Sequence, residues 1–295
     1  MEYEQIYQGD MVEIFRISEH LYFRRANLAV RGQCNGALIV SNNGVAIVDA
    51  PPGGIEMIDE AEKLFHKPVT AVFLTHGHTD HANGLAPFLD RELTVYCCYR
   101  LLSQLVPKDH VCRANFVGVD GYLNLRFSGG VEVELSTLND VAHSKGDMFV
   151  RIPEADAICT GDTVVEYQTA YFHSADIVSW IYSLKQLAKM KGKYVLAGHG
   201  VTLFPYSYID EFANHLSVVE KCACICFMRF HPELLGGMEE DRFAHVNTEE
   251  VRELVEQFFE EHSSDALYLE DHAGKEDARR EVRMVLWGFI REWIR

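Results

Sequence analysis

Three histidines and an aspartate lie within six consecutive residues of this chain, and this cluster constrains the fold more than any other feature. The four residues are His76, His78, Asp80 and His81. They directly follow the apolar run 69–74, which is typical of a buried strand. Gly77 lets the backbone turn there, so that neighbouring side chains converge instead of alternating between two faces. Because imidazole nitrogens and carboxylate oxygens are common ligands of divalent metals, we expect the chain to fold around a metal site.

Three further candidate ligands lie far from this cluster in the sequence. His143 stands in the segment AHSKGD, Asp162 in TGDT and His199 in AGHG. Each adjoins a predicted strand and has a glycine close by, which is the arrangement expected of ligand loops at strand ends. The seven donors together predict one site that is built from separate loops.

The pattern of apolar residues indicates an α/β protein up to about residue 205. Short β-type runs are separated by turn signals and alternate with helices that are predicted over 55–65 and 176–190. The predicted strands are 12–17, 21–24, 37–41, 45–49, 69–75, 93–97, 122–127, 131–135, 147–152, 157–160 and 194–197. Residues 1–205 are therefore expected to form the core that carries the site.

Beyond residue 205 the strand signals stop. Helices are predicted over 208–228, 247–261 and 276–294, where apolar residues recur at helical spacing. We interpret residues 206–295 as a helical extension. It would either cover the core as a cap or form the surface of a homodimer.

Charge and composition narrow the classes of function. The 295 residues include 27 Lys and Arg against 44 Asp and Glu, which gives a formal net charge of −17. This balance argues against a broad positive surface, so we expect no nucleic-acid partner.

The sequence opens with the polar and acidic residues MEYEQ and has no apolar run of about 18 residues, so we expect a cytoplasmic protein with no membrane partner. Its eight cysteines are expected to be thiols.

The seven donors resemble the signature of the metallo-β-lactamase superfamily, which is HxHxDH followed by separate His, Asp and His residues. The resemblance covers about the first 205 residues, and all seven positions are filled. It implies a four-layer αββα sandwich, in which two sheets pack face to face with helices outside and two metal ions bind at one edge. The ligands it implies are His76, His78 and His143 for the first metal, Asp80, His81 and His199 for the second, and Asp162 between both.

The resemblance also bears on the identity of the metals. Flavodiiron proteins of this fold have a carboxylate at the second position of the HxH pair, where this chain has His78. The difference favours two zinc ions and hydrolysis, although imidazole and carboxylate ligands also accept iron or manganese. Asp49, at the end of a predicted strand, is expected to hydrogen-bond to the ligand loop, and the alternative is that it caps the turn before Pro51.

Two neighbouring cations that share a water lower its pKa toward neutrality and leave a hydroxide nucleophile. The sequence therefore predicts a hydrolase of a small-molecule ester, thioester, lactone or lactam, in which Asp80 both ligates a metal and orients the hydroxide. Tyr171 and His173, in the aromatic loop 167–173, are candidates for substrate contact, and simple packing is the alternative. The other functions open to this ligand set are an iron-dependent oxygenase or redox protein and a phosphodiester hydrolase.

Overall fold

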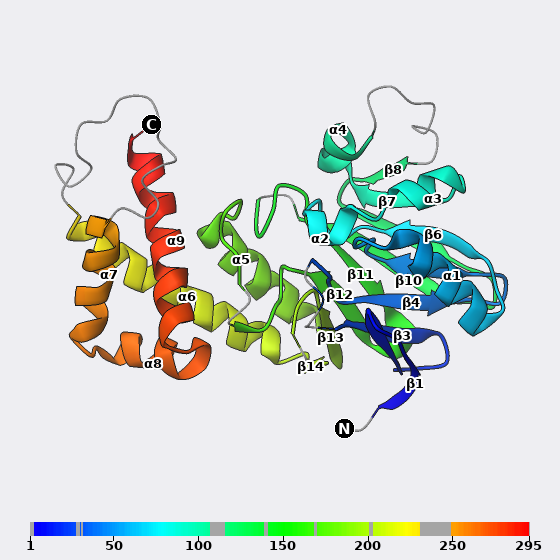
Figure 1. Cartoon of the computed structure of the whole chain (residues 1–295), viewed down its shortest axis with the longest axis horizontal. Coiled ribbons are helices and arrows are strands. Elements are labelled where there is room, and N and C mark those ends of the chain that lie inside the picture. The colour runs from blue at the N-terminus through cyan, green and yellow to red at the C-terminus, as the bar shows by residue number, and fades with distance from the viewer. Residues whose placement is uncertain are drawn as a thin grey trace.

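The computed structural model of the protein describes residues 3–27, 30, 32–106, 116–138, 141–167, 170–200, 203–230 and 249–294. Two β-sheets pack face to face and helices cover both outer faces, which confirms the predicted αββα sandwich (Figure 1). The C-terminal helices form a lobe beside the sandwich. The long helix α6, Tyr208–Met228, runs from the sandwich into this lobe.

The first sheet contains eight strands in chain order. Neighbouring strands are antiparallel from the first to the fifth and parallel from the fifth to the eighth. The strands are β1 (Glu4–Gln8), β2 (Val12–Arg16), β3 (Leu21–Ala26), β4 (Gly36–Val40), β5 (Val45–Val48), β6 (Val69–Phe73), β7 (Thr94–Cys98) and β8 (Phe116–Val119). The sequence pattern misses β1, which buries none of its residues, and β8, which has four residues with a glycine among them.

The second sheet contains six strands in the order β14-β13-β12-β11-β10-β9. β12 and β13 are parallel, and the other neighbours are antiparallel. The strands are β9 (Tyr122–Arg126), β10 (Glu132–Thr137), β11 (Met148–Ile152), β12 (Ala157–Gly161), β13 (Tyr194–Ala197) and β14 (Phe204–Pro205). The sequence pattern misses β14 because two residues are too few to show an alternation.

Apolar side chains of both sheets form the core between them. Alternate residues of a strand face one side of a sheet, so Leu21 and Phe23 of β3 reach this core, as do Val133 and Leu135 of β10. Burying each of these side chains stabilises the fold by about 1.5–3 kcal/mol. The core thereby fixes the two sheets relative to each other, and with them the loops at their common edge.

Helices cover the outer face of the first sheet. They are α1 (Gly54–Phe65), α3 (Ala86–Asp90) and α4 (Leu102–Leu105). The short helix α2 (Thr79–Ala82) follows β6 at the edge of the sandwich. Met57, Ile58 and Ala61 of α1 recur at one helical turn and pack against Leu38 and Ile47 of the sheet. The predicted helix 55–65 thus coincides with α1.

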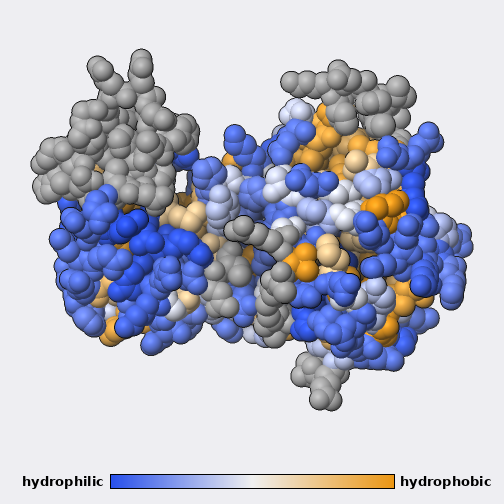
Figure 2. Space-filling view, in the orientation of Figure 1, coloured by the Kyte–Doolittle hydropathy of each residue, from blue (hydrophilic) through white to orange (hydrophobic). Residues whose placement is uncertain are grey.

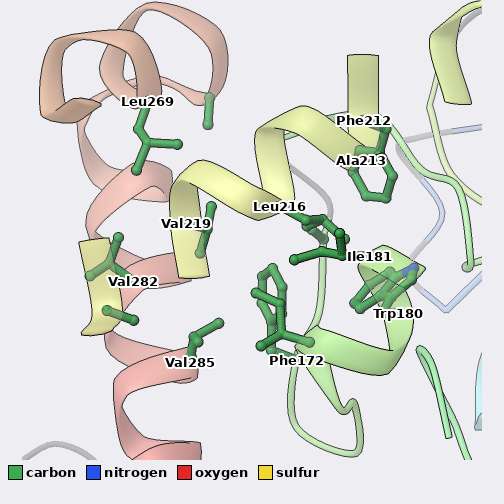
Figure 3. Packing of buried hydrophobic residues seen from close by; sticks show 14 of the residues in the cluster. Phe172, Trp180, Ile181, Phe212, Ala213, Leu216, Val219, Leu269, Val282 and Val285 are labelled. Atoms are coloured by element: carbon green, nitrogen blue, oxygen red, sulfur yellow. The ribbon is translucent and has the colours of Figure 1, made fainter. Parts of the chain in front are cut away.

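A second group of helices begins beside the second sheet and continues away from it into the C-terminal lobe (Figure 1). After α6 and its predecessor α5 (Ile177–Leu187) come α7 (Glu249–Glu260), α8 (Ser264–Ala273) and α9 (Lys275–Ile294). Trp180 of α5 and Phe172 pack in the same hydrophobic cluster as Leu216 of α6 and Val285 of α9 (Figure 3). Continuous apolar packing therefore joins the C-terminal helices to the sandwich.

The described part of the C-terminal region contains one helix more than predicted. The additional helix, α8, is capped by Ser263, whose hydroxyl accepts a hydrogen bond from the backbone N–H of Ala266 at 3.2 Å. It ends at Gly274, whose φ of 84° closes the helix just before α9 begins. The predicted start of the preceding helix at Asn247 lies outside the described residues.

The surface of the C-terminal lobe is mostly hydrophilic on the face that Figure 2 shows. Within the described ranges, no helix combines the length and the apolar character that crossing a bilayer would require. The apolar residues of α7, α8 and α9 instead face the cluster that they share with α6.

Candidate metal centre

The seven predicted donors meet at one edge of the sandwich, although they come from distant parts of the chain. His76 to His81 follow β6, His143 lies in the loop before β11, and Asp162 and His199 follow β12 and β13. Because β5 and β6 are parallel, as are β12 and β13, the carboxyl ends of each pair lie on the same edge of their sheet. The fold thus brings together all seven side chains.

The first group of donors consists of His76, His78, His143 and Asp162, whose ligand atoms all lie within 4.8 Å of one another. The Nδ1 atom of His78 is 3.0 Å from the Nε2 atom of His76 and 3.0 Å from the Nε2 atom of His143. The Oδ2 atom of Asp162 is 3.9 Å from His76 Nε2 and 3.6 Å from His143 Nε2. Three ring nitrogens that face one another cannot all form hydrogen bonds with one another. Their arrangement is that of ligands around one cation.

The second group consists of Asp80, His81, His199 and, again, Asp162. The Nε2 atom of His199 is 3.0 Å from Asp80 Oδ2 and 3.4 Å from Asp162 Oδ2. The Nε2 atom of His81 is 3.1 Å from Asp162 Oδ1 and 3.8 Å from Asp80 Oδ2. Asp162 therefore presents one carboxylate to both groups.

Two buried atoms between these side chains, His81 Nε2 and Asp162 Oδ1, lie 3.1 Å apart without the geometry of a hydrogen bond, and neither has another partner among the described residues. A buried polar atom without a partner is costly, and such atoms in native sites are commonly satisfied by an ion or a water. Imidazole nitrogens and carboxylate oxygens are the ligands that zinc and related divalent metals accept. The residues present thus fit two cations that share Asp162.

A family model described as the metallo-beta-lactamase superfamily matches residues 29–199, which is more than half of the chain. The chain belongs to this superfamily. It is 25% identical over 177 residues to metallo-beta-lactamase IND-1 of Chryseobacterium indologenes, covering 56% of this chain and 71% of that protein. To the metallo-beta-lactamase type 2 of Bacillus cereus it is 25% identical over 174 residues, which are 56% of this chain and 66% of that protein. The predicted resemblance is therefore confirmed.

A solved structure of a metallo-beta-lactamase from Pontibacter korlensis matches with a TM-score of 0.59 and 17% sequence identity. The match covers 70% of this chain and 99% of that chain. At this identity the likeness shows the superfamily fold alone.

Burial and nearby carboxylates shift the pKa values of the site histidines in opposite directions. Burial lowers the pKa of His143 to about 3 and holds the pKa of His76 well below its usual value. Burial also opposes protonation of His199, but the carboxylates of Asp162 and Asp80 outweigh it and raise its pKa to about 10. The carboxylates of Asp80 and Asp162 thus create a negative potential around His199, and such a potential favours a bound cation.

Hydrogen bonds behind the donors orient their rings. The buried carboxylate of Asp49 accepts from Nδ1 of His81 at 2.8 Å and from the backbone N–H of Thr75 at 2.7 Å. The hydroxyl of Thr75 donates to Asp49 at 2.8 Å and lies 3.2 Å from Nδ1 of His76. Protons held on Nδ1 leave Nε2 of His76 and His81 free to bind a metal. Asp49 thus contacts the ligand loop, as a supporting residue would.

Two further residues support the site, and the sequence analysis did not identify either of them. The Ser174 hydroxyl lies 2.9 Å from Nε2 of His78 and donates to the backbone carbonyl of His143 at 3.3 Å. The side-chain amide of Asn35 donates to the carbonyl of Gly200 at 3.0 Å, and its backbone N–H donates to the carbonyl of Gly198 at 2.7 Å. Each is a single polar residue outside any motif, so only the folded chain shows its role.

The open side of the centre lies beside Asp80 and His199, whose side chains are 26% and 24% exposed. Tyr171 is 49% exposed, and its ring centroid lies 6.3 Å from that of His78. The ring of His173 stacks on Tyr171 with 5.9 Å between centroids. These two residues therefore stand at the rim of the centre, where an entering molecule would pass.

Proposed function

We propose that this protein is a hydrolase that uses two divalent metal ions to cleave a small ester, thioester, lactone or lactam. The observation that carries the proposal is the carboxylate of Asp162, which both donor groups share at an open edge of the sandwich. Membership of the superfamily supports it, since the named relatives are metallo-beta-lactamases. Zinc suits a donor set so rich in imidazole.

His76, His78 and His143 would hold the first cation, Asp80, His81 and His199 the second, and Asp162 both. When bound, such a pair of cations lowers the pKa of a shared water and polarises the substrate oxygen. Asp49, Thr75 and Ser174 hold the rings in place, so the site is organised before substrate arrives.

Asp80 is the residue of this set that we propose as catalytic. Its carboxylate is partly exposed and lies 3.0 Å from His199 and 3.8 Å from His81, so it faces the open side rather than the core. From this position it can accept a hydrogen bond from the attacking water and orient it toward the substrate carbonyl. Tyr171 and His173 would form the wall against which the substrate rests.

The proposal is tested by loading the metal-free protein with zinc, manganese or iron under anaerobic conditions. Each form is then assayed against a panel of esters, thioesters, lactones, β-lactams and phosphodiesters, and separately for dioxygen uptake. We expect hydrolysis of a carbonyl substrate that depends on added metal, with no dioxygen uptake. Uptake by the iron form without hydrolysis of any panel member would contradict the proposal, and cleavage confined to phosphodiesters would reassign the substrate.

The role of Asp80 is tested by Asp80→Asn. We expect kcat to fall by about 100-fold or more, because general-base assistance typically contributes that much, while the first metal stays bound. Asp90→Asn provides a matched control, since Asp90 ends α3 away from the donors. An unchanged kcat in Asp80→Asn would remove this residue from the mechanism.

A further inference from the structure

A buried arginine without a carboxylate partner lies outside the metal centre. Arg24 of β3 is 2% exposed, and it points to the α1 side of the first sheet because its neighbour Phe23 faces the core between the sheets. Its Nη2 donates to the sulfur of Cys34 at 3.8 Å, and sulfur is a weak acceptor. Its Nε has no partner, and no carboxylate of the described residues lies within 4.0 Å of its guanidinium. A buried guanidinium is normally paired, so this one lacks a carboxylate in direct contact.

Arg24 lines a cavity of about 200 Å³ between the first sheet and α1. Most of the wall is apolar and comes from Met11, Ile14, Leu38 and Met57. An apolar cavity of about 150 Å³ is large enough to hold benzene, so this one has room for a short hydrocarbon chain or ring. The cavity therefore joins an apolar wall to an unpaired buried cation.

The exposed end of the same cavity has the opposite charge. Glu56, in the first turn of α1, is exposed, and Glu60 one turn later is half-buried. The carboxylate of Glu60 accepts a hydrogen bond from the hydroxyl of Tyr7 at 2.7 Å, which holds it in place. A simple anion would thus meet two carboxylates before it reached Arg24, on a chain with a net charge of −17.

A ligand that satisfies both ends carries a carboxylate, an ammonium group and an apolar body. Guanidinium binds carboxylate through two parallel hydrogen bonds, which is the recognition that arginine favours. We propose that this cavity binds a free amino acid with an apolar side chain, its carboxylate on Arg24 and its ammonium group toward Glu56 and Glu60. The bound side chain packs against the methionines and aliphatic residues of the wall.

This site is distinct from the metal centre but lies close behind it. The sulfur of Cys34, which Arg24 contacts, lies within 4.8 Å of the ligand atoms of Asp49 and His81. Arg24 and Cys34 therefore stand between the cavity and the hydrogen bonds that orient His81. Binding at this site does not require the protein to be a hydrolase, so the two proposals stand or fall separately.

The test is calorimetric titration of the full-length, metal-loaded protein with L-leucine. The comparison ligands are 4-methylpentanoate, which lacks the ammonium group, and 3-methylbutylamine, which lacks the carboxylate. We expect one saturable leucine site and binding at least about 10-fold weaker for each comparison ligand, because each leaves one charged group of the cavity unpaired. No leucine binding at about 10 mM, or equal binding of either comparison ligand, would overturn the proposal.

Two variants locate the binding. Arg24→Met removes the guanidinium, and because it also removes an unpaired buried charge we expect it to fold. Ala61→Leu fills the cavity from α1 and leaves Arg24 in place. Each should weaken leucine binding by about 10-fold or more. Arg25→Met, which disrupts the partly exposed pair with Glu13 and the cation–π contact with Phe15 but does not touch the cavity lining, should not. Unchanged binding in both cavity variants would contradict the assignment.

Discussion

Replacing Asp49 by asparagine should weaken the second metal site through the protonation state of His81. One oxygen of Asp49 accepts from the backbone N–H of Thr75 at 2.7 Å, and the other accepts from Nδ1 of His81 at 2.8 Å. Asparagine has the same shape but only one acceptor oxygen. When that oxygen accepts from the backbone N–H of Thr75, the side-chain NH₂ of asparagine faces Nδ1 of His81. Two donors cannot face each other, so Nδ1 of His81 can no longer carry a proton.

The neutral ring of His81 would consequently carry its proton on Nε2, the atom that lies 3.1 Å from Asp162. A protonated Nε2 cannot ligate a metal, so binding at the second site would require the other tautomer and a lost hydrogen bond. Outer hydrogen-bond partners of this kind are worth about 10- to 100-fold in metal affinity. That range corresponds to about 1.4–2.8 kcal/mol. It should fall on the second site, because the Thr75 hydroxyl beside His76 can still donate to the remaining oxygen of residue 49, from which it lies 3.0 Å in the wild type.

The assay is zinc binding measured in competition with a chelator of known affinity, with the protein concentration and pH held constant. At a free zinc level only just sufficient to fill both sites of the wild type, Asp49→Asn should retain between about 1 and about 1.5 equivalents of zinc. Asp59→Asn is the matched control, because Asp59 is an exposed residue that pairs with Arg91 on the surface. Two equivalents bound to Asp49→Asn with wild-type affinity would refute the reasoning about the tautomer.

Three further outcomes follow from the packing of the site and of the C-terminal lobe. Asp162→Ala should lose zinc from both sites and abolish hydrolysis, and a variant with full zinc content would show that Asp162 is not shared. Gly198→Ala should also lose zinc, because a Cβ there would lie 2.1 Å from Asp162 Oδ1, and metal content equal to the wild type would contradict this. Glu281→Ala should lower the free energy of unfolding by about 1–3 kcal/mol in urea denaturation, because it leaves the buried Nε2 of His215 without its hydrogen-bond partner at 2.8 Å. Glu281→Gln should cost less, and equal losses would mean that the charge of Glu281 plays no part.

Much of the fold could be predicted from the sequence because periodicity reports burial. Strands with a buried face or full burial, such as β4 and β6, show continuous or alternating apolar residues. The pattern fails where burial is weak or the element is short, as in the exposed β1 and the two-residue β14. It also fails at α8, which is only ten residues long and is defined by its cap and by Gly274.

The residues of the candidate site also fall into two groups, those that a local sequence motif reveals and those that only the folded structure reveals. The cluster from His76 to His81 could be found because several costly side chains stand side by side in the sequence. Ser174 and Asn35 could not, since each supports the site through one hydrogen-bonding side chain whose partner lies more than 90 residues away. Arg24 belongs to the same class, because a single arginine in a strand pattern does not reveal that it is buried without a carboxylate.

The central claim is that side chains from separate loops hold two neighbouring cations that share one carboxylate. Anomalous diffraction from crystals of the zinc-loaded protein, recorded above and below the zinc absorption edge, tests it directly. The account predicts two zinc peaks, one among His76, His78 and His143 and one among Asp80, His81 and His199, with Asp162 contacting both. A single peak, or zinc bound away from these residues, would contradict it.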